Sequence, residues 1–281
     1  MVQIITDSAA DFESYEYEKL NVKCIPLYVS IGGREYKETV ELSKDLFYQL
    51  LEQDDGFPHT AQPSPQCFAE KITEAQEKGD EIIIITLSSA LSGTYQGAQL
   101  AKNIAEYDHC YVVDSLTATG GQRLLVEYAV RLRKKGKSAP EIVSAIEEIR
   151  SRIVLYACMD TMEYLCRGGR ISHTTYTIGS IVHVKPIITV TKEGTVAIPS
   201  KAIGIRKGIG FMCGKVDEHP PDDNHPLYVM FTGNRKNAEI LRTRLQEMGC
   251  EVPDDRIINV GAAIGSHIGP NACGLVYIQK E

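Results

Sequence analysis

Apolar runs alternate with amphipathic stretches along the first half of the chain. Three of these runs are short and rich in β-branched side chains, at residues 2–6, 81–87 and 110–113. Runs of this kind predict strands that are buried on both faces, as in a parallel sheet. Helical patterns follow Gly93 and lie near 119–135 and 139–150. The alternation of strand and helix predicts a mainly parallel α/β sheet flanked by helices over residues 1–152.

The pattern changes in two places. Residues 22–40 predict a small β-hairpin insertion, because the Gly32-Gly33 pair supplies the positive φ that a tight turn needs. In the second half, two β-rich runs at 186–191 and 195–202 flank a Lys-Glu-Gly turn and predict another hairpin. We therefore expect a mixed α+β unit over residues 153–281.

Composition and charge narrow the class of protein. The chain has 281 residues, a formal net charge of −7 and no block of like charges. Such a surface repels nucleic-acid phosphates and offers no obvious dock for an anionic membrane. The N-terminal segment lacks the features of a secretory signal, and no apolar run reaches the ~18 residues of a membrane span. The eight scattered cysteines are then typical of reduced thiols, and we expect a cytoplasmic protein.

Small hydroxyl residues and glycine gather near strand ends and before helices. Four segments share this composition, at residues 60–64, 88–94, 114–117 and 261–274. In an open α/β sheet, ligands bind beyond the carboxyl ends of the strands, where helix N-termini offer N–H groups to an anion. Any one segment alone is more typical of caps and turns. Four of them in one chain favour a shared anion site.

Ser92 and His267 carry the candidate chemistry within these segments. Gly93 lets the backbone approach a ligand closely, although Ser92 equally suits a helix N-cap. His267 lies in a predicted loop flanked by glycines, where it either serves an anion or is an ordinary surface histidine. Arg167 and Arg170 surround a Gly-Gly turn, a pattern that suits phosphate or carboxylate recognition.

Other chemistry has weaker support. Asp7, Asp11 and Asp114 follow strands or lie near turns, where an aspartate most often stabilises its own turn, so we assign them no chemistry. The sequence contains no G-x-x-x-x-G-K-[ST] loop, no G-x-G-x-x-G fingerprint and no G-x-S-x-G elbow. Its cysteines and histidines lack zinc-site spacing. We therefore expect neither a metal nor a cofactor.

Taken in order, the motifs resemble those of the bacterial DegV family of fatty-acid-binding proteins. The matching segments are residues 6–11, 60–65, 87–96, 113–115, 165–172, 185–187 and 261–274. Each motif is weak singly, but their order and spacing are specific and cover essentially the whole chain. The resemblance implies two α/β lobes with a fatty acid in an apolar tunnel between them.

The resemblance also implies how the ligand is held. It implies that Thr60 and Ser92 hydrogen-bond the carboxylate of a long-chain fatty acid, and that His267 lies near this head group. We add Gly93 to this predicted site because a glycine there lets the backbone come close to the ligand. Ala61 departs from the family pattern, since a serine usually stands there, and the change removes one donor near the head group.

The family is similar to one arm of a fatty acid kinase system. In that system a separate ATP-dependent kinase phosphorylates the bound carboxylate, and the product feeds phospholipid synthesis. The resemblance therefore implies a carrier without catalysis of its own, in transient contact with a membrane acyltransferase. Arg170, Arg206 and Lys207 match basic positions that face the kinase, although the Arg206-Lys207 pair alone is typical of solvated charges.

Two other functions stay open. A serine-dependent hydrolase or acyltransferase would use Ser92 as nucleophile, His267 as base and Asp114 to orient the histidine. The residue types are present, but the elbow context around the serine is not. A regulatory module would instead bind a partner protein and keep the lipid only as a structural plug.

Overall fold

Three β-sheets organise the computed structural model, which describes residues 1–53, 56–172 and 184–281. The first sheet is wholly parallel, with the strand order β2–β1–β6–β7. Its strands are β1 Val2–Asp7, β2 Val22–Ile25, β6 Glu81–Thr86 and β7 Cys110–Asp114. The four isoleucines of β6 are fully buried, which confirms the expectation of a strand covered on both faces.

Helices cover both faces of this parallel sheet. One face carries α3 (Pro65–Glu77) and α4 (Thr94–Ala105), and the other carries α5 (Gly120–Lys134) and α6 (Ala139–Ile149). Ser138 begins α6 with a capping box, and its Oγ and backbone N–H both donate to the Glu141 side chain. Pro65 stands in the first turn of α3, where its missing N–H costs nothing.

The expected hairpin at 22–40 is only partly right. Its first half divides at Pro26, and β2 pairs in parallel with β1 in the main sheet. Its second half is an antiparallel hairpin of β3 (Tyr28–Ile31) and β4 (Arg34–Lys37), and β5 (His59–Ala61) adds a third strand. Gly32 and Gly33 have the positive φ values, 59° and 74°, that this turn requires.

The second half of the chain forms a six-stranded mixed sheet, as expected. Its order is β10–β9–β8–β13–β11–β12, antiparallel except for the β11–β12 pair. The strands are β8 Ile153–Cys158, β9 Val184–Val190, β10 Val196–Ile203, β11 Tyr228–Phe231, β12 Ile257–Asn259 and β13 Cys273–Ile278. The predicted hairpin is the β9–β10 pair.

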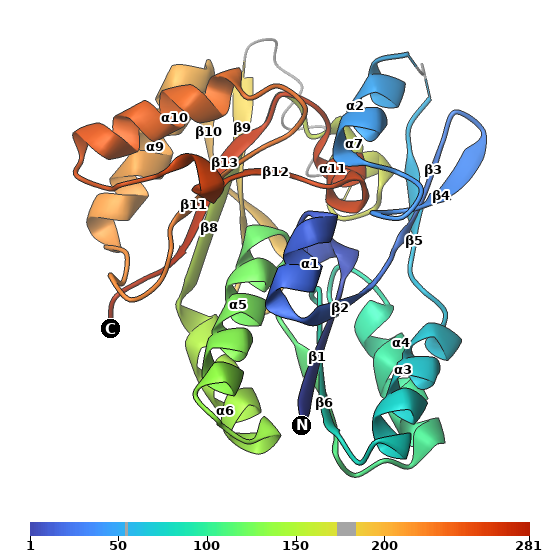
Figure 1. Ribbon diagram of the computed structural model, residues 1–281. Helices are drawn as coiled ribbons and strands as arrows, with labels where there is room; N and C mark the ends of the chain where they lie inside the picture. The colour runs from blue at the N-terminus through green and yellow to red at the C-terminus, as the bar shows by residue number, and fades with distance from the viewer. Residues whose placement is uncertain (54–55, 173–183) are drawn as a thin grey trace.

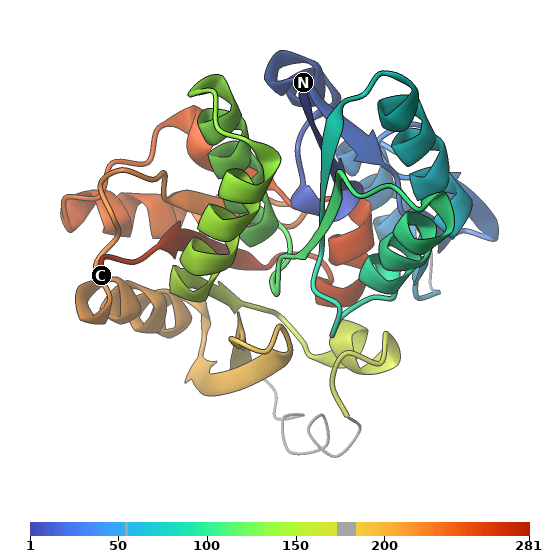
Figure 2. The ribbon, with the colours of Figure 1, turned by 90° about the horizontal axis from the view of Figure 1, so that it is seen from below.

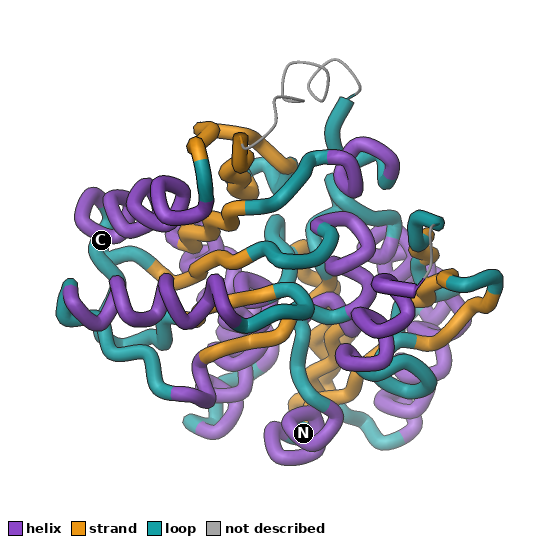
Figure 3. The backbone as a smooth tube through the Cα atoms, turned by 90° about the horizontal axis from the view of Figure 1, so that it is seen from above, coloured by secondary structure: helices purple, strands orange, loops and turns teal. Residues whose placement is uncertain are grey.

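Helix α5 lies between the two large sheets and joins their cores. It contacts β1 and β6 on one side and β8 and β13 on the other, so Leu124, Leu125 and Val126 share one core with both. On the outer face of the mixed sheet lie α9 (Ile205–Glu218) and α10 (Lys236–Glu247). Figures 2 and 3 show this order of helix and sheet layers from below and from above.

Shorter elements complete the described chain. They are η1 Ser8–Ala10, α1 Ser14–Leu20, α2 Lys44–Gln53, η2 Arg150–Arg152, α7 Glu163–Arg167, η3 Asp254–Arg256 and α11 Ala262–Ile268. The predicted loop around His267 is wrong, because α11 occupies residues 262–268. Across the residues described, no helix is long and apolar enough to cross a membrane.

Candidate functional site

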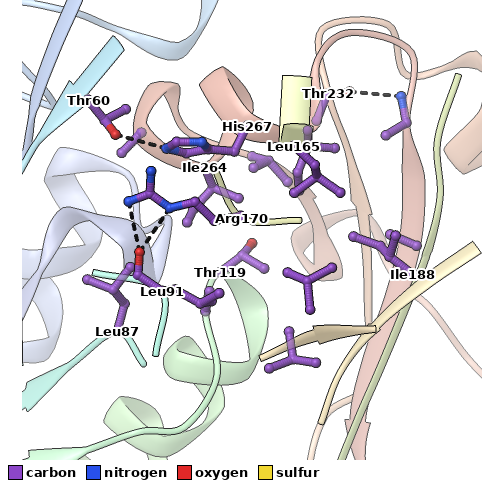
Figure 4. A pocket seen from close by; sticks show the side chains of 18 of the residues that line it. Thr60, Leu87, Leu91, Thr119, Leu165, Arg170, Ile188, Thr232, Ile264 and His267 are labelled. Atoms are coloured by element: carbon purple, nitrogen blue, oxygen red, sulfur yellow. Dashed lines mark hydrogen bonds between the residues drawn. The ribbon is translucent and has the colours of Figure 1, made fainter. Parts of the chain in front are cut away.

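A cavity of about 380 Å³ lies between the mixed sheet and the loops that follow the strands of the parallel sheet. Apolar side chains from β8, β9 and β11 line most of it, together with Leu87, Leu91 and residues of α11. Polar groups gather mainly at one end, shown in Figure 4. The predicted carboxylate residues Thr60, Ser92, Gly93 and His267 all line the cavity. Arg170, which was expected to face a kinase, lines it as well. The cavity is thus apolar along its body and polar at this end, within the size range of small-molecule sites.

Thr60 and His267 meet across 207 residues of sequence. Thr60 lies at the middle of β5, paired with Val29 of β3, and its Oγ1 is 2.8 Å from Nε2 of His267. His267 lies in the last turn of α11, so the expectation of a loop histidine is wrong. The helix is short and its glycine content hides it, but it packs Ala262 and Ala263 into the core. Figure 4 shows the threonine and the histidine pointing toward each other.

Burial keeps the His267 imidazole neutral. It lowers the pKa of His267 to about 3, and the positive charges of Arg170 and His59 act in the same direction. Nδ1 is buried without a hydrogen-bond partner among the described residues. Gly168 lies against that side of the ring, since a Cβ there would be 2.1 Å from Nδ1. The ring therefore has one polar link, through Nε2 to Thr60.

Ser92 and Gly93 stand at the start of α4, on the facing wall of the polar end. Gly93 occupies the N-cap position that the sequence analysis considered for Ser92. The Ser92 hydroxyl instead bonds the Thr94 hydroxyl at 2.9 Å and accepts from the Thr94 backbone N–H at 3.3 Å. Gln62, which the motif analysis missed, folds over Gly93, and a Cβ on Gly93 would lie 2.0 Å from its Oε1. Ala61 also lines the cavity.

Arg170 ties the turn after α7 to the loop that precedes Ser92. Its Nε and Nη2 donate to the Leu91 carbonyl at 3.0 and 2.8 Å, and its Nη1 donates to the Gly168 carbonyl at 2.5 Å. Figure 4 shows the guanidinium beneath the Thr60–His267 pair. Arg206 and Lys207 lie exposed in the first turn of α9, outside the walls of this cavity.

The apolar body of the cavity contains two threonines that sequence reasoning did not single out. The Thr119 hydroxyl donates to Oδ2 of Asp11, and the Thr232 hydroxyl accepts from the Ala272 backbone N–H at 2.8 Å. Their polar atoms are therefore already paired within the protein. The wall behind the polar end consequently presents mainly hydrocarbon to a ligand.

The aspartates left without chemistry serve the backbone, as expected for turn residues. Asp7 accepts from Ala9 at 3.0 Å and from Leu87 at 2.8 Å. Asp114 accepts from the backbone N–H groups of Ser89 and Leu116. These bonds hold the loop after β6, which carries Ser92, against the ends of the parallel strands.

A serine-hydrolase triad is not assembled among the described residues. Nε2 of His267 bonds to Thr60 rather than to Ser92, and its Nδ1 faces Gly168 rather than a carboxylate. Asp114 is engaged by the backbone amides of Leu116 in its own turn and of Ser89 in the loop after β6. A triad needs a nucleophile–base bond and a base–carboxylate bond, and the geometry here offers neither.

Fold and site together define an α/β protein with two large sheets and an apolar cavity that ends in hydroxyl groups and a neutral histidine. The chain belongs to the DegV family, since the model of that family, described as an uncharacterised protein family, matches residues 1–280. A DegV domain-containing protein from Clostridium acetobutylicum is 32% identical over 281 residues, covering 99% of each chain.

Solved structures of the family share the whole fold. A fatty-acid-binding DegV family protein from Thermus thermophilus superposes with a TM-score of 0.89 at 28% identity, covering 99% of both chains. A stearic-acid-binding protein from Eubacterium ventriosum superposes with a TM-score of 0.89 at 25% identity, covering 100% of this chain and 99% of the other. The expected DegV resemblance is thereby confirmed, and so is the expected α/β fold with a helix-flanked parallel sheet and a mixed second sheet.

Proposed function

We propose that this protein binds a long-chain fatty acid, with the hydrocarbon in the apolar cavity and the carboxylate at the polar end. The observation that carries this proposal is the lining of the cavity, which is apolar along its body and polar at one end. Such a lining suits a ligand with a long hydrocarbon part and one polar head group. The fatty-acid-binding relatives of the same fold support it.

The carboxylate is held by neutral donors. Thr60 and Ser92 present hydroxyls, Gly93 allows close approach of the backbone, and His267 is neutral because of its low pKa, about 3. If Nε2 carries the imidazole proton and donates to the Thr60 oxygen, the Thr60 hydroxyl proton is free to donate to the ligand. The Arg170 guanidinium adds positive potential while its own donors serve carbonyl groups.

Most of the affinity comes from the hydrocarbon. Each buried methylene contributes about 0.8 kcal/mol, so a chain of about sixteen carbons gains on the order of 12 kcal/mol before the costs of association. A carboxylate buried without partners would cost several kcal/mol, which the hydroxyl donors offset. A modest head-group site is thus sufficient for tight binding.

Native mass spectrometry tests the proposal directly. Protein made in bacteria should carry a mass increment of one fatty acid, and delipidated protein should bind oleate and palmitate in titration. If only the protein mass is seen and neither acid binds, the proposed function is wrong. Reaction of Ser92 with a fluorophosphonate in folded, delipidated protein would instead favour the hydrolase.

We further propose that the protein is a carrier that presents the carboxylate to a separate ATP-dependent kinase. A second, more polar hollow adjoins the head-group end, between the loop at 89–93, Arg170 and Thr195, and offers a route to that carboxylate. Arg206 and Lys207 supply exposed positive charge for such a partner. Acyl phosphate should form only when kinase, ATP and loaded carrier are mixed, and Arg206→Glu/Lys207→Glu should slow it without changing oleate affinity.

A further inference from the structure

Two fully buried carboxylates hold the N-terminal end of α11, the helix that carries His267. Asp11 Oδ1 accepts from the Gly261 backbone N–H at 2.9 Å, and Glu38 Oε1 accepts from the Ala263 backbone N–H at 2.8 Å. Both side chains are at most 2% exposed. They come from the opposite end of the chain, more than 220 residues away in sequence.

The helix depends on these contacts. It has seven residues, too few to be stable by itself, and no side chain of its own caps its N-terminus. Its first N–H groups are buried and must be paired within the protein. The Tyr48 hydroxyl adds a third tether, because it donates to the carbonyl of Val260 at 2.9 Å.

The second oxygen of each carboxylate bonds a hydroxyl group elsewhere in the protein. Glu38 directly follows β4, in the small sheet whose β5 carries Thr60, and its Oε2 accepts from the Ser8 hydroxyl at 2.5 Å. Asp11 Oδ2 accepts from the hydroxyl of Thr119, which lines the cavity. Each carboxylate therefore connects the start of α11 to an element that forms the binding site.

We propose that Asp11 and Glu38 are positioning residues, which act through α11 to set where His267 meets Thr60 and the ligand carboxylate. His267 lies four residues beyond Ala263, about 6 Å along the helix axis, so a shift at the N-terminus is passed to the ring. Holding two carboxylates in the interior is costly. Burial raises the pKa of Asp11 to about 6 and that of Glu38 to about 7. Ordinary hydroxyl caps would avoid this cost, but they would not reach from the small sheet to the helix.

Substitutions at Glu38 separate geometry from charge. Glu38→Gln keeps the length and an acceptor for the Ala263 N–H, whereas Glu38→Asp keeps the charge but shortens the reach. We expect Glu38→Gln to bind oleate within about twofold of wild type and Glu38→Asp to bind it about 5- to 100-fold more weakly, because a buried donor loses its acceptor. Glu127→Asp is the control, since Glu127 is a partly buried glutamate that bonds Tyr228 and Arg123, away from α11.

Methyl oleate is the second probe, because it has the same hydrocarbon without a carboxylate. If positioning is the role, Glu38→Asp weakens oleate and leaves methyl oleate within about twofold. Equal loss for the acid and the ester, or the same loss in Glu127→Asp, would mean general destabilisation and would overturn the proposal. Asp11→Asn, which keeps one acceptor oxygen, should give a smaller loss than Asp11→Ala.

This inference rests on the proposed function for its binding arm, so a ligand-free measurement accompanies it. In ligand-free protein, the ring signals of His267 in a nuclear magnetic resonance spectrum should shift in Glu38→Asp and stay in place in Glu38→Gln and Glu127→Asp. Unchanged ring signals in Glu38→Asp would overturn the positioning role. If the wild-type protein does not bind oleate, only the proposed function is overturned. The ring signals of His267 in ligand-free protein would still test the positioning role.

Discussion

Gly168 offers a direct way to move His267 without touching a polar group. The residue closes α7 with φ −72° and ψ −5°, a backbone conformation that alanine adopts without strain. A methyl group at this position would lie 2.1 Å from Nδ1 of His267 and 3.0 Å from the carbonyl oxygen of Tyr164. Gly168→Ala therefore forces the imidazole to move away from α7, and its Nε2 to leave Thr60.

The expected change in stability is the balance of two opposing effects, and the expected change in oleate affinity comes from one lost hydrogen bond. Overpacking costs about 1–3 kcal/mol, and the reduced freedom of the unfolded chain returns about 0.4–1 kcal/mol. We therefore expect the free energy of unfolding to fall by up to about 2.6 kcal/mol. Loss of the Thr60–His267 bond is worth about 0.5–1.5 kcal/mol, which corresponds to oleate binding about 2- to 12-fold more weakly.

Titration of delipidated protein with oleate measures the binding change, and urea unfolding measures the stability change. Gly210→Ala is the control, because Gly210 lies inside α9 and a Cβ there meets nothing within 4 Å. This control should gain roughly 0.5–1 kcal/mol of stability and bind oleate like wild type. Wild-type oleate affinity in Gly168→Ala, with unchanged His267 ring signals, would refute the argument that Gly168 fixes the ring.

The remaining predictions concern the head group, pH and chain length. Ser92→Ala should weaken oleate binding by about 1–3 kcal/mol in titration, and unchanged affinity would remove Ser92 from the site. The folded-state pKa of His267, about 3, is below the ordinary 6.5, so its contribution to stability is present above pH 6.5 and is lost as pH falls toward 3. His267→Gln should flatten that loss in urea unfolding below pH 6.5. The Glu38 pKa is raised from 4.5 to about 7, so its contribution to stability is present below pH 4.5 and is lost as pH rises through 7, and Glu38→Gln should remove that decline. Ala157→Leu, in the apolar wall, should shift preference from oleate toward a twelve-carbon acid by about 1–3 kcal/mol, and an unchanged ratio would contradict the assigned tail region.

Strands with long, uninterrupted apolar runs could be predicted, as at residues 82–85, whereas the three-residue strands β5 and β12 were not. Helices α9 and α11 were not predicted, and both contain a glycine required by close packing. In α9, a Cβ on Gly208 would lie 2.4 Å from Sγ of Cys158 on β8. In α11, a Cβ on Gly265 would lie 2.7 Å from the Tyr48 hydroxyl oxygen. Glycine lowers helix propensity and interrupts the apolar stripe, so the feature that allows these helices to pack also hides them in the sequence.

In the candidate site, too, residues within sequence motifs could be predicted, whereas residues whose partners lie far away in the sequence could not. Thr60, Ser92 and His267 were selected by motifs, and the structure places all three on one cavity. Asp11 and Glu38 were not selected, because their partners are backbone N–H groups more than 220 residues away. A side chain that serves a distant backbone group leaves no spacing pattern, and only the fold reveals it.

The two ends of the cavity are built from different parts of the molecule, and this separates two properties of binding. Loops and the short helix α11 form the polar end, whereas strands such as β8 and β9 form the apolar wall. If the proposed function holds, head-group donors contribute a fixed amount for every acid, while the wall contributes about 0.8 kcal/mol for each methylene it covers. Substitutions in the strands should therefore change which chain length is preferred and leave discrimination between acid and ester intact. Under the proposed function, substitutions that move α11 should do the reverse, because the position of this helix sets where His267 meets Thr60.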